Sequence, residues 1–307
     1  MRRFRREAAG SPAAGNNMTL LDEILENKRI ETESRKKSVP LEELKDRAKS
    51  RTGRSFKDAL AREGFGLIGE IKKRSPSMGE MRPENAARAL EAYGRSGSIR
   101  ALSILTDGRY FGGSLEDLSQ AREAVSKPIL RKDFILEEYQ VWEAKAFGAD
   151  AILLMASAHE ADPGKFKGLF DLAISLGLDA LIEFGLEAPP RKEFMPPGAL
   201  LFGINARVFK DSDRYRASRE QGEGTGKDLT TDLGIHADLY AELEKIAPEG
   251  KILVAESGIR SREDLGPLMD LGYRAALIGT AFLKKNDLPR TLGEFDDYLA
   301  ARRTGHT

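Results

Sequence analysis

The sequence predicts an α/β protein with the (β/α)8 fold, the TIM barrel, extended by extra N-terminal helices. Eight short apolar segments rich in β-branched residues recur along the chain. Mostly helical stretches separate them, which is typical of parallel βαβ units. Several segments follow a glycine that ends the preceding helix, as in "AFGADAILL". Eight such units in one domain predict a closed barrel. The alternative is a doubly wound open sheet, but no predicted strand is followed by a GxGxxG turn.

Three helices precede the first predicted strand and form an N-terminal annex, residues 19–63. In the first helix Leu21, Ile24, Leu25 and Lys28 have the spacing of one helix face, and Thr19 suits its N-cap. The second helix covers residues 41–49 and the third 55–63. The annex belongs to a single domain that spans residues 19–303.

The eight predicted strands are apolar runs bounded by turn residues. They cover residues 65–73, 100–107, 127–134, 149–155, 179–184, 199–206, 251–257 and 275–281. The helices between them are predicted at 83–95, 114–125, 137–147, 162–176, 236–246 and 261–270.

Two segments break this alternation. Residues 1–18 are basic and then small and polar, without the apolar region of a signal peptide, and we interpret them as a disordered extension. Residues 210–232 form a polar, glycine-containing insertion, which is either a surface loop or a lid or interface element. No run in the sequence approaches the roughly 20 apolar residues of a membrane span.

Composition restricts the class of protein. The 49 basic residues balance 49 acidic ones, so no overall field favours nucleic acid or an anionic membrane. The absence of cysteine removes disulfides, thiolate nucleophiles and Cys-type zinc sites, and it agrees with a cytoplasmic location. The three histidines lack metal-ligand spacing. We therefore expect an enzyme without metal or cofactor that uses lysine and carboxylate side chains.

Charged residues stand at the ends of several predicted strands. The segment "LIGEIKKRSPSMG" places Glu70 and Lys72 two residues apart, on one face of the first strand. The same alternation turns Lys132, Glu183 and Asn205 inward at the ends of the third, fifth and sixth strands. Each residue alone is explained by a structural ion pair or a solvated strand end. Together, from four strands at the rim where barrel active sites lie, they predict a catalytic cavity whose groups shift each other's pKa.

The last two strands carry a different signal. "ESGIRS" and "IGTAF" place Ser257, Gly258, Gly279 and Thr280 in neighbouring loops. Glycine lets backbone N–H groups approach an anion, and the loops after strands 7 and 8 are the usual phosphate site of this fold. Tight turns also use glycine, but the position of these residues favours a phosphate site.

Eight ordered blocks resemble the indole-3-glycerol phosphate synthase family of tryptophan biosynthesis. They are "LLDEILENKR", "GEIKKRSPSMG", "ALSILTDGRYFGGSLEDL", "PILRKDFILEEYQVWEAKAFGADAILLM", "LIEF", "FGINAR", "VAESGI" and "LIGTAFL", and they cover about residues 19–290. The resemblance implies a lyase that closes the ring of 1-(2-carboxyphenylamino)-1-deoxyribulose 5-phosphate. The products are indole-3-glycerol phosphate, carbon dioxide and water, and the family uses no cofactor or metal.

The resemblance also implies roles for the charged residues. Lys132 is the general acid at the substrate ketone, a role that calls for a pKa lowered by burial and neighbouring cations. Lys72 binds the substrate carboxylate and so positions the ring. Glu183 carries out the proton transfer of the dehydration. Glu70 and Asn205 orient the two lysines and the substrate hydroxyls.

The other implied contacts are to the phosphate and the aryl ring. The implied phosphate-binding residues are Ser75, Ser257, Gly258, Gly279 and Thr280. The candidates for the apolar wall around the ring are Phe111, Phe134 and Leu153, although core packing explains Leu153 equally well. Arg207 is a further substrate-binding candidate on the face of Asn205.

Two other functions compete with this one. The sister barrel phosphoribosylanthranilate isomerase relies on a Cys–Asp pair, and this chain has no cysteine. A catalytically silent paralogue would use the insertion 210–232 as a contact surface, but the ionisable groups at positions 70, 72, 132 and 183 are all intact. The expected partner is a small phosphorylated substrate, not nucleic acid or a membrane, and the expected state is a monomer or a weak homo-oligomer.

Overall fold

The computed structural model describes residues 19–75, 79–209, 229–231 and 234–303 of the chain. The extension predicted at 1–18 lies outside these ranges, and so does most of the insertion predicted at 210–232. Both therefore stay predictions.

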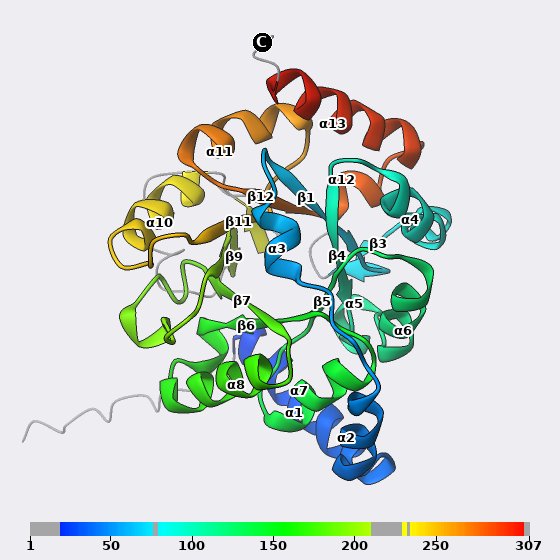
Figure 1. Ribbon diagram of the computed structural model, residues 1–307, viewed down its shortest axis with the longest axis vertical. Coiled ribbons are helices and arrows are strands. Elements are labelled where there is room, and N and C mark those ends of the chain that lie inside the picture. The colour runs from blue at the N-terminus through cyan, green and yellow to red at the C-terminus, as the bar shows by residue number, and fades with distance from the viewer. Residues whose placement is uncertain (1–18, 76–78, 210–228, 232–233, 304–307) are drawn as a thin grey trace, which may run out of the picture.

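Eight parallel strands close into a barrel in the order β1-β12-β11-β8-β7-β6-β5-β4 (Figure 1). The strands are β1 (Gly66–Ile71), β4 (Ile99–Leu105), β5 (Ile129–Lys132), β6 (Ala151–Met155), β7 (Asp179–Phe184), β8 (Leu201–Asn205), β11 (Ile252–Glu256) and β12 (Ala275–Ile278). The predicted barrel is thus confirmed, and each strand falls within its predicted segment to within a residue. The register places Glu183 opposite Gly203, and Asn205 opposite Glu256, so these strands end at one rim.

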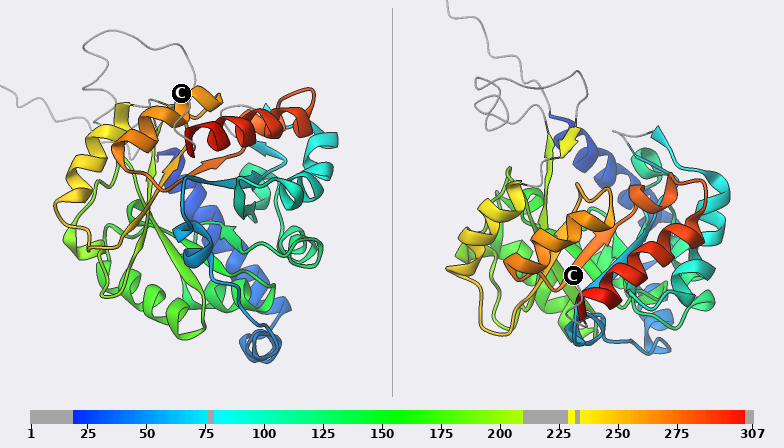
Figure 2. Two further views of the ribbon diagram at one scale, coloured as in Figure 1. Left: turned by 45° about the horizontal axis from the view of Figure 1, so that its top comes forward. Right: turned by 90° about the horizontal axis from the view of Figure 1, so that it is seen from above.

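Helices surround the strands on the outside (Figure 2). Those in the predicted positions are α4 (Pro83–Arg95), α6 (Leu115–Ala124), α7 (Glu138–Ala146), α8 (Pro163–Ser175), α10 (Gly234–Glu244) and α11 (Leu265–Leu271). No range was predicted for α5 (Gly108–Phe111), α12 (Thr280–Leu283) and α13 (Leu288–Arg303), nor for the short 3-10 turns at 156–159 and 192–194, whereas the 3-10 turn at 262–264 lies within the helical stretch predicted at 261–270. No helix in the described ranges has the length and apolar character that a membrane crossing requires.

The three annex helices form as predicted. They are α1 (Leu20–Ser38), α2 (Leu41–Lys49) and α3 (Phe56–Ala61). Thr19 caps α1, because its Oγ1 accepts the backbone N–H of Asp22 at 3.1 Å. In α1, Ile24 and Leu25 pack with Leu105 at the end of β4. Helix α1 therefore covers part of the rim where the strands end.

Helix α3 closes the opposite end of the barrel. In Figure 1 it lies in front of the strands, and its residues Phe56 and Leu60 pack among inward side chains such as Ile68 and Leu130. Helix α2 projects at one side (Figure 2), where Leu44 packs against Tyr139 of α7. Helix α3 thus fills the end of the barrel opposite the carboxyl ends of the strands, and the interior opens at the carboxyl ends.

Truncating Phe56 is expected to destabilise the barrel strongly. The side chain is completely buried, and Phe56→Ala leaves a cavity between α3 and the inner strands. Such a change lowers the free energy of unfolding by about 3 to 5 kcal/mol. Urea denaturation measures it, and Lys57→Ala, the next residue of the same helix, is the control. A loss below about 1 kcal/mol would contradict this packing.

Two short antiparallel pairs were not predicted. Strands β2 (Arg74–Ser75) and β3 (Gly79–Glu80) pair after β1, and β9 (Arg207–Phe209) pairs with β10 (Leu229–Thr231) on either side of residues 210–228. Strands of two or three residues are too short for an alternating pattern to show. Arg207 consequently belongs to β9 and not to the barrel strand that ends at Asn205.

Candidate active site

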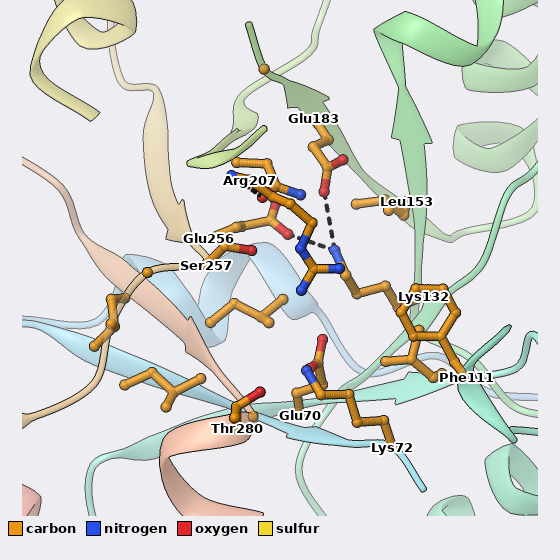
Figure 3. A pocket seen from close by; sticks show the side chains of 18 of the residues that line it. Glu70, Lys72, Phe111, Lys132, Leu153, Glu183, Arg207, Glu256, Ser257 and Thr280 are labelled. Carbon is orange, nitrogen blue, oxygen red and sulfur yellow. Dashed lines mark hydrogen bonds and ion pairs between the residues drawn. The ribbon is translucent and has the colours of Figure 1, made fainter. Parts of the chain in front are cut away.

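A cavity of about 530 Å³ opens at the carboxyl ends of the barrel strands. Every predicted site residue except Ser75 lines it: Glu70, Lys72, Phe111, Lys132, Phe134, Leu153, Glu183, Asn205, Arg207, Ser257, Gly258, Gly279 and Thr280. The side chain of Ser75 lies outside the described part of the structure. Figure 3 shows Lys132 and the Glu70–Lys72 pair entering the cavity from different strands.

Lys132 stands at the end of β5 between two carboxylates. Its Nζ lies 3.0 Å from Oε2 of Glu183 and 2.6 Å from Oε2 of Glu256 (Figure 3). Lys132 is 14% exposed at its side chain, whereas both glutamates are almost fully buried. An ammonium with two buried carboxylates can exchange protons with them and with a bound ligand.

The sequence analysis missed Glu256. The alternation that identified Glu183 applies equally to "KILVAES", where Val254 and Glu256 share the inward face of β11. Oε1 of Glu256 is buried and accepts no hydrogen bond from the described residues. It lies against Gly203, where a Cβ atom would overlap it. The glycine in β8 thus makes room for this carboxylate.

The pKa of Lys132 differs from the expectation. A lowered value was predicted, and burial does act in that direction, but the carboxylates of Glu183, Glu256 and Glu70 outweigh it and raise the pKa of Lys132. The prediction was wrong because it did not include Glu256 and did not anticipate how closely two acids approach Nζ. Lys132 therefore holds its proton at neutral pH when no ligand neutralises these acids.

Glu70 and Lys72 form the second buried ion pair of the cavity, bonded carboxylate to ammonium. Burial lowers the pKa of Lys72, and Arg207 adds to this effect, while Glu70 opposes it. Burial alone would raise the pKa of Glu70, but Lys72 and Lys132 hold it below its ordinary value. Gly279 packs so close to the Glu70 carboxylate that a Cβ there would overlap it. This glycine therefore has a packing role besides the predicted contact with phosphate.

Replacing Glu256 with Gln is expected to change how stability depends on pH. Burial and the neighbouring Glu183 raise the pKa of Glu256 to about 8, against an ordinary value of 4.5, although Lys132 opposes the shift. The folded protein therefore holds a proton that the unfolded chain releases, and wild-type stability falls as pH rises through this interval. The amide of Glu256→Gln does not titrate, so the variant does not lose this stability as the pH rises. Urea denaturation gives the free energy of unfolding of both proteins at about pH 5 and pH 8. Between these two pH values, the stability of the variant relative to the wild type should increase. Parallel pH profiles would contradict the shift.

The loops after β11 and β12 form another wall of the cavity. Ser257 has φ of 67° and Gly258 of 83°, so two consecutive residues adopt the left-handed conformation. The Nε2 of buried His236 lies 3.3 Å from the carbonyl oxygen of Ser257. The lining also includes three cationic residues that were not predicted: Arg260, Lys284 and Lys285. This wall suits a small anion.

Asn205 has a more local contact than expected. Its Oδ1 accepts the backbone N–H of Arg207 at 3.0 Å, which fixes the turn between β8 and β9. The described hydrogen bonds join Asn205 to neither Lys72 nor Lys132. Arg207 itself lines the cavity, and its guanidinium lies beside the end of the Lys132 side chain in Figure 3.

An apolar wall stands near Lys72 and Lys132. The rings of Phe111 and Phe134 lie 6.4 Å apart at 38°, and Ile24 of α1 belongs to the same apolar cluster. Leu153 lines the cavity and also belongs to the inner barrel cluster, so both explanations of this residue apply. The sequence analysis did not connect Ile24 with the site. The cavity therefore combines an apolar wall, a cluster of acids and bases, and an anion-binding wall.

Comparisons with known proteins give consistent results. A family model described as indole-3-glycerol phosphate synthase matches residues 21–213 and 226–295. An indole-3-glycerol phosphate synthase from Lachnospira eligens is 37% identical over 287 residues, covering 92% of this chain and 99% of the relative. One from Leptospira interrogans is 40% identical over 240 residues, covering 77% and 84%. The crystal structure of 3-hexulose-6-phosphate synthase from Salmonella typhimurium matches with a TM-score of 0.55 at 11% identity, covering 79% of this chain and all of that one, which concerns the fold alone.

Proposed function

Because the chain belongs to the indole-3-glycerol phosphate synthase family, we infer that it converts 1-(2-carboxyphenylamino)-1-deoxyribulose 5-phosphate to indole-3-glycerol phosphate, carbon dioxide and water. It is then a lyase of tryptophan biosynthesis. The observation within the chain that best supports this is Lys132 held between Glu183 and Glu256 in a cavity with an apolar wall and an anion-binding wall.

The substrate has a carboxylate on its aryl ring and a phosphate at the far end of its sugar chain. We propose that the phosphate binds at Ser257, Gly258, Gly279 and Thr280, with Arg260 adding positive charge at the cavity lining. The aryl ring then lies against Phe111 and Phe134, and its carboxylate meets the ammonium of Lys72. Fixing both ends holds the ring carbon near the ketone, which is a positioning effect.

The first step forms a carbon–carbon bond between the ring carbon that bears the carboxylate and the ketone carbon. We propose that Lys132 gives its proton to the ketone oxygen as this bond forms, so that the oxygen becomes a hydroxyl. The raised pKa of Lys132 means that the proton is present at neutral pH. Loss of carbon dioxide then restores the aromatic ring.

The second part of the reaction removes water. One carbon loses the new hydroxyl, which leaves with a proton as water, and the neighbouring methylene loses a proton. We propose that Glu183, bonded to Lys132 at 3.0 Å, takes part in this proton transfer. Glu256, whose pKa is raised to about 8, keeps a second proton in the same cluster, so Lys132 can be reprotonated locally. Glu70 keeps Lys72 oriented through their ion pair.

The test is turnover by the purified full chain. Incubation with the substrate should produce indole fluorescence together with an equal amount of carbon dioxide. No indole from a folded protein that still binds the product would contradict the proposed function and favour the silent paralogue. The cytoplasmic location and the monomeric or weakly associated state stay predictions from the sequence.

A further inference from the structure

A completely buried lysine lies where α1 meets the barrel rim. The Nζ of Lys28 is 2.7 Å from Glu31, 3.0 Å from Asp107 and 2.9 Å from Asp133. The side chains of Lys28, Asp107 and Asp133 have no exposed surface, whereas Glu31 is partly exposed. None of these charges takes part in the reaction proposed above. Burying them is costly unless the pairs are well formed, so their arrangement calls for an explanation.

Each of the two buried aspartates begins a segment that holds one aromatic wall residue. Asp107 caps α5, because its Oδ1 accepts the N–H of Tyr110 at 2.7 Å, and α5 ends at Phe111. Asp133 accepts the backbone N–H of Phe134 at 2.9 Å. The single ammonium of Lys28 therefore joins the bases of the two segments whose rings lie 6.4 Å apart.

Asp133 also connects this centre to β5. Its Oδ2 accepts the hydroxyl of Thr106 at 2.6 Å and a guanidinium N–H of Arg131 at 3.0 Å. The backbone N–H of Thr106 in turn donates to the carbonyl of Lys132 at 3.2 Å. One helical turn before Lys28, Ile24 belongs to the same apolar cluster as both aromatic rings and lines the cavity.

We propose that Lys28 is a positioning residue for the reaction: its ammonium holds Asp107 and Asp133 together and thereby sets the relative position of Phe111 and Phe134, the wall on which the substrate's aryl ring lies. The inference rests on the proposed function, because that function places the aryl ring against this wall. Without Lys28 the two aspartates lose their shared cation, and among the ion pairs of the described residues only Asp133 keeps another, with Arg131. Repulsion and hydration of the freed carboxylates then separate the two segments.

The test compares Lys28→Met with Lys36→Met in the full chain. Lys36 lies on the same helix and pairs with Glu33 and Glu137, each at 2.6 Å, but it is a third exposed and far along α1 from the cavity wall residues. The probes are indole-3-glycerol phosphate, measured by calorimetry, and inorganic phosphate, measured by phosphorus NMR. Lys28→Met should weaken product binding about tenfold or more and lower kcat/KM by about 10- to 100-fold, with phosphate binding unchanged. Lys36→Met should change none of these.

The relative effect on the two probes distinguishes positioning from general damage. Equal weakening of product and phosphate, or unchanged product binding, would overturn the inference. If Lys28→Met does not fold, Lys28→Met/Asp107→Asn removes one of the freed charges and keeps an oxygen for the Tyr110 N–H. This double variant should fold and still bind phosphate but bind product weakly, and wild-type product affinity in it would overturn the inference. A wild-type protein that binds phosphate but neither binds nor forms the product overturns the proposed function, and this inference with it.

Discussion

Replacing Lys132 with Ala is expected to lower kcat/KM by about a thousandfold, within the range of a lost general acid. The ammonium that would protonate the ketone oxygen disappears. Glu183 and Glu256, which both contact it, are left facing each other without a cation. Steady-state indole fluorescence measures the loss. Lys132→Arg should be almost as inactive, because a guanidinium keeps the charge but gives up a proton far less readily.

A matched control for Lys132 is Lys73→Ala. Lys73 also stands near the end of a barrel strand, but its Nζ points to Asp117 on α6 at 2.8 Å and not into the cavity. This variant should keep wild-type kcat/KM. If Lys132→Ala keeps a kcat/KM within about tenfold of the wild type, Lys132 is not the general acid. This conclusion would hold even if the reaction itself were confirmed.

Glu183→Gln is expected to separate the two halves of the reaction. An amide cannot take up the proton that must leave the methylene carbon, so indole formation should fall about 100- to 1,000-fold. Ring closure and decarboxylation depend on Lys132, which keeps its contact with Glu256 at 2.6 Å. We therefore expect carbon dioxide to exceed indole during a single turnover.

Quenched samples measured for both products give this ratio. Glu160→Gln serves as the control, because Glu160 pairs with Arg191 at the protein surface at 2.9 Å. A Glu183→Gln protein that is slow but releases carbon dioxide and indole in equal amounts would place the effect of Glu183 before decarboxylation.

The sequence predicted the barrel well because the signals are local and repeated. Eight apolar runs separated by helical stretches allow few other folds. The alternation of side chains along the strands predicted that Glu70, Lys72, Lys132 and Glu183 all face one cavity. Short elements such as β2, β3 and α5 have too few residues for such a pattern.

What the sequence could not predict depends on contacts between distant segments. The raised pKa of Lys132 comes from Glu183 and Glu256 together, and Glu256, which lies 124 residues away, approaches only when the barrel closes. The sequence places Lys28 on the same helix face as Leu21, Ile24 and Leu25, yet its partners Asp107 and Asp133 come from two other segments. Burial with a specific set of charges is a property of the assembled fold and leaves no local pattern.

A crystal structure of the full chain with indole-3-glycerol phosphate tests these residue assignments most directly. The predicted complex has the phosphate at Ser257, Gly258, Gly279 and Thr280, and the indole ring against Phe111 and Phe134. In it Lys132 and Glu183 contact the part of the product nearest the new ring bond. A product bound outside the cavity, or with its ring and phosphate exchanged, would contradict the assignment of every residue proposed here.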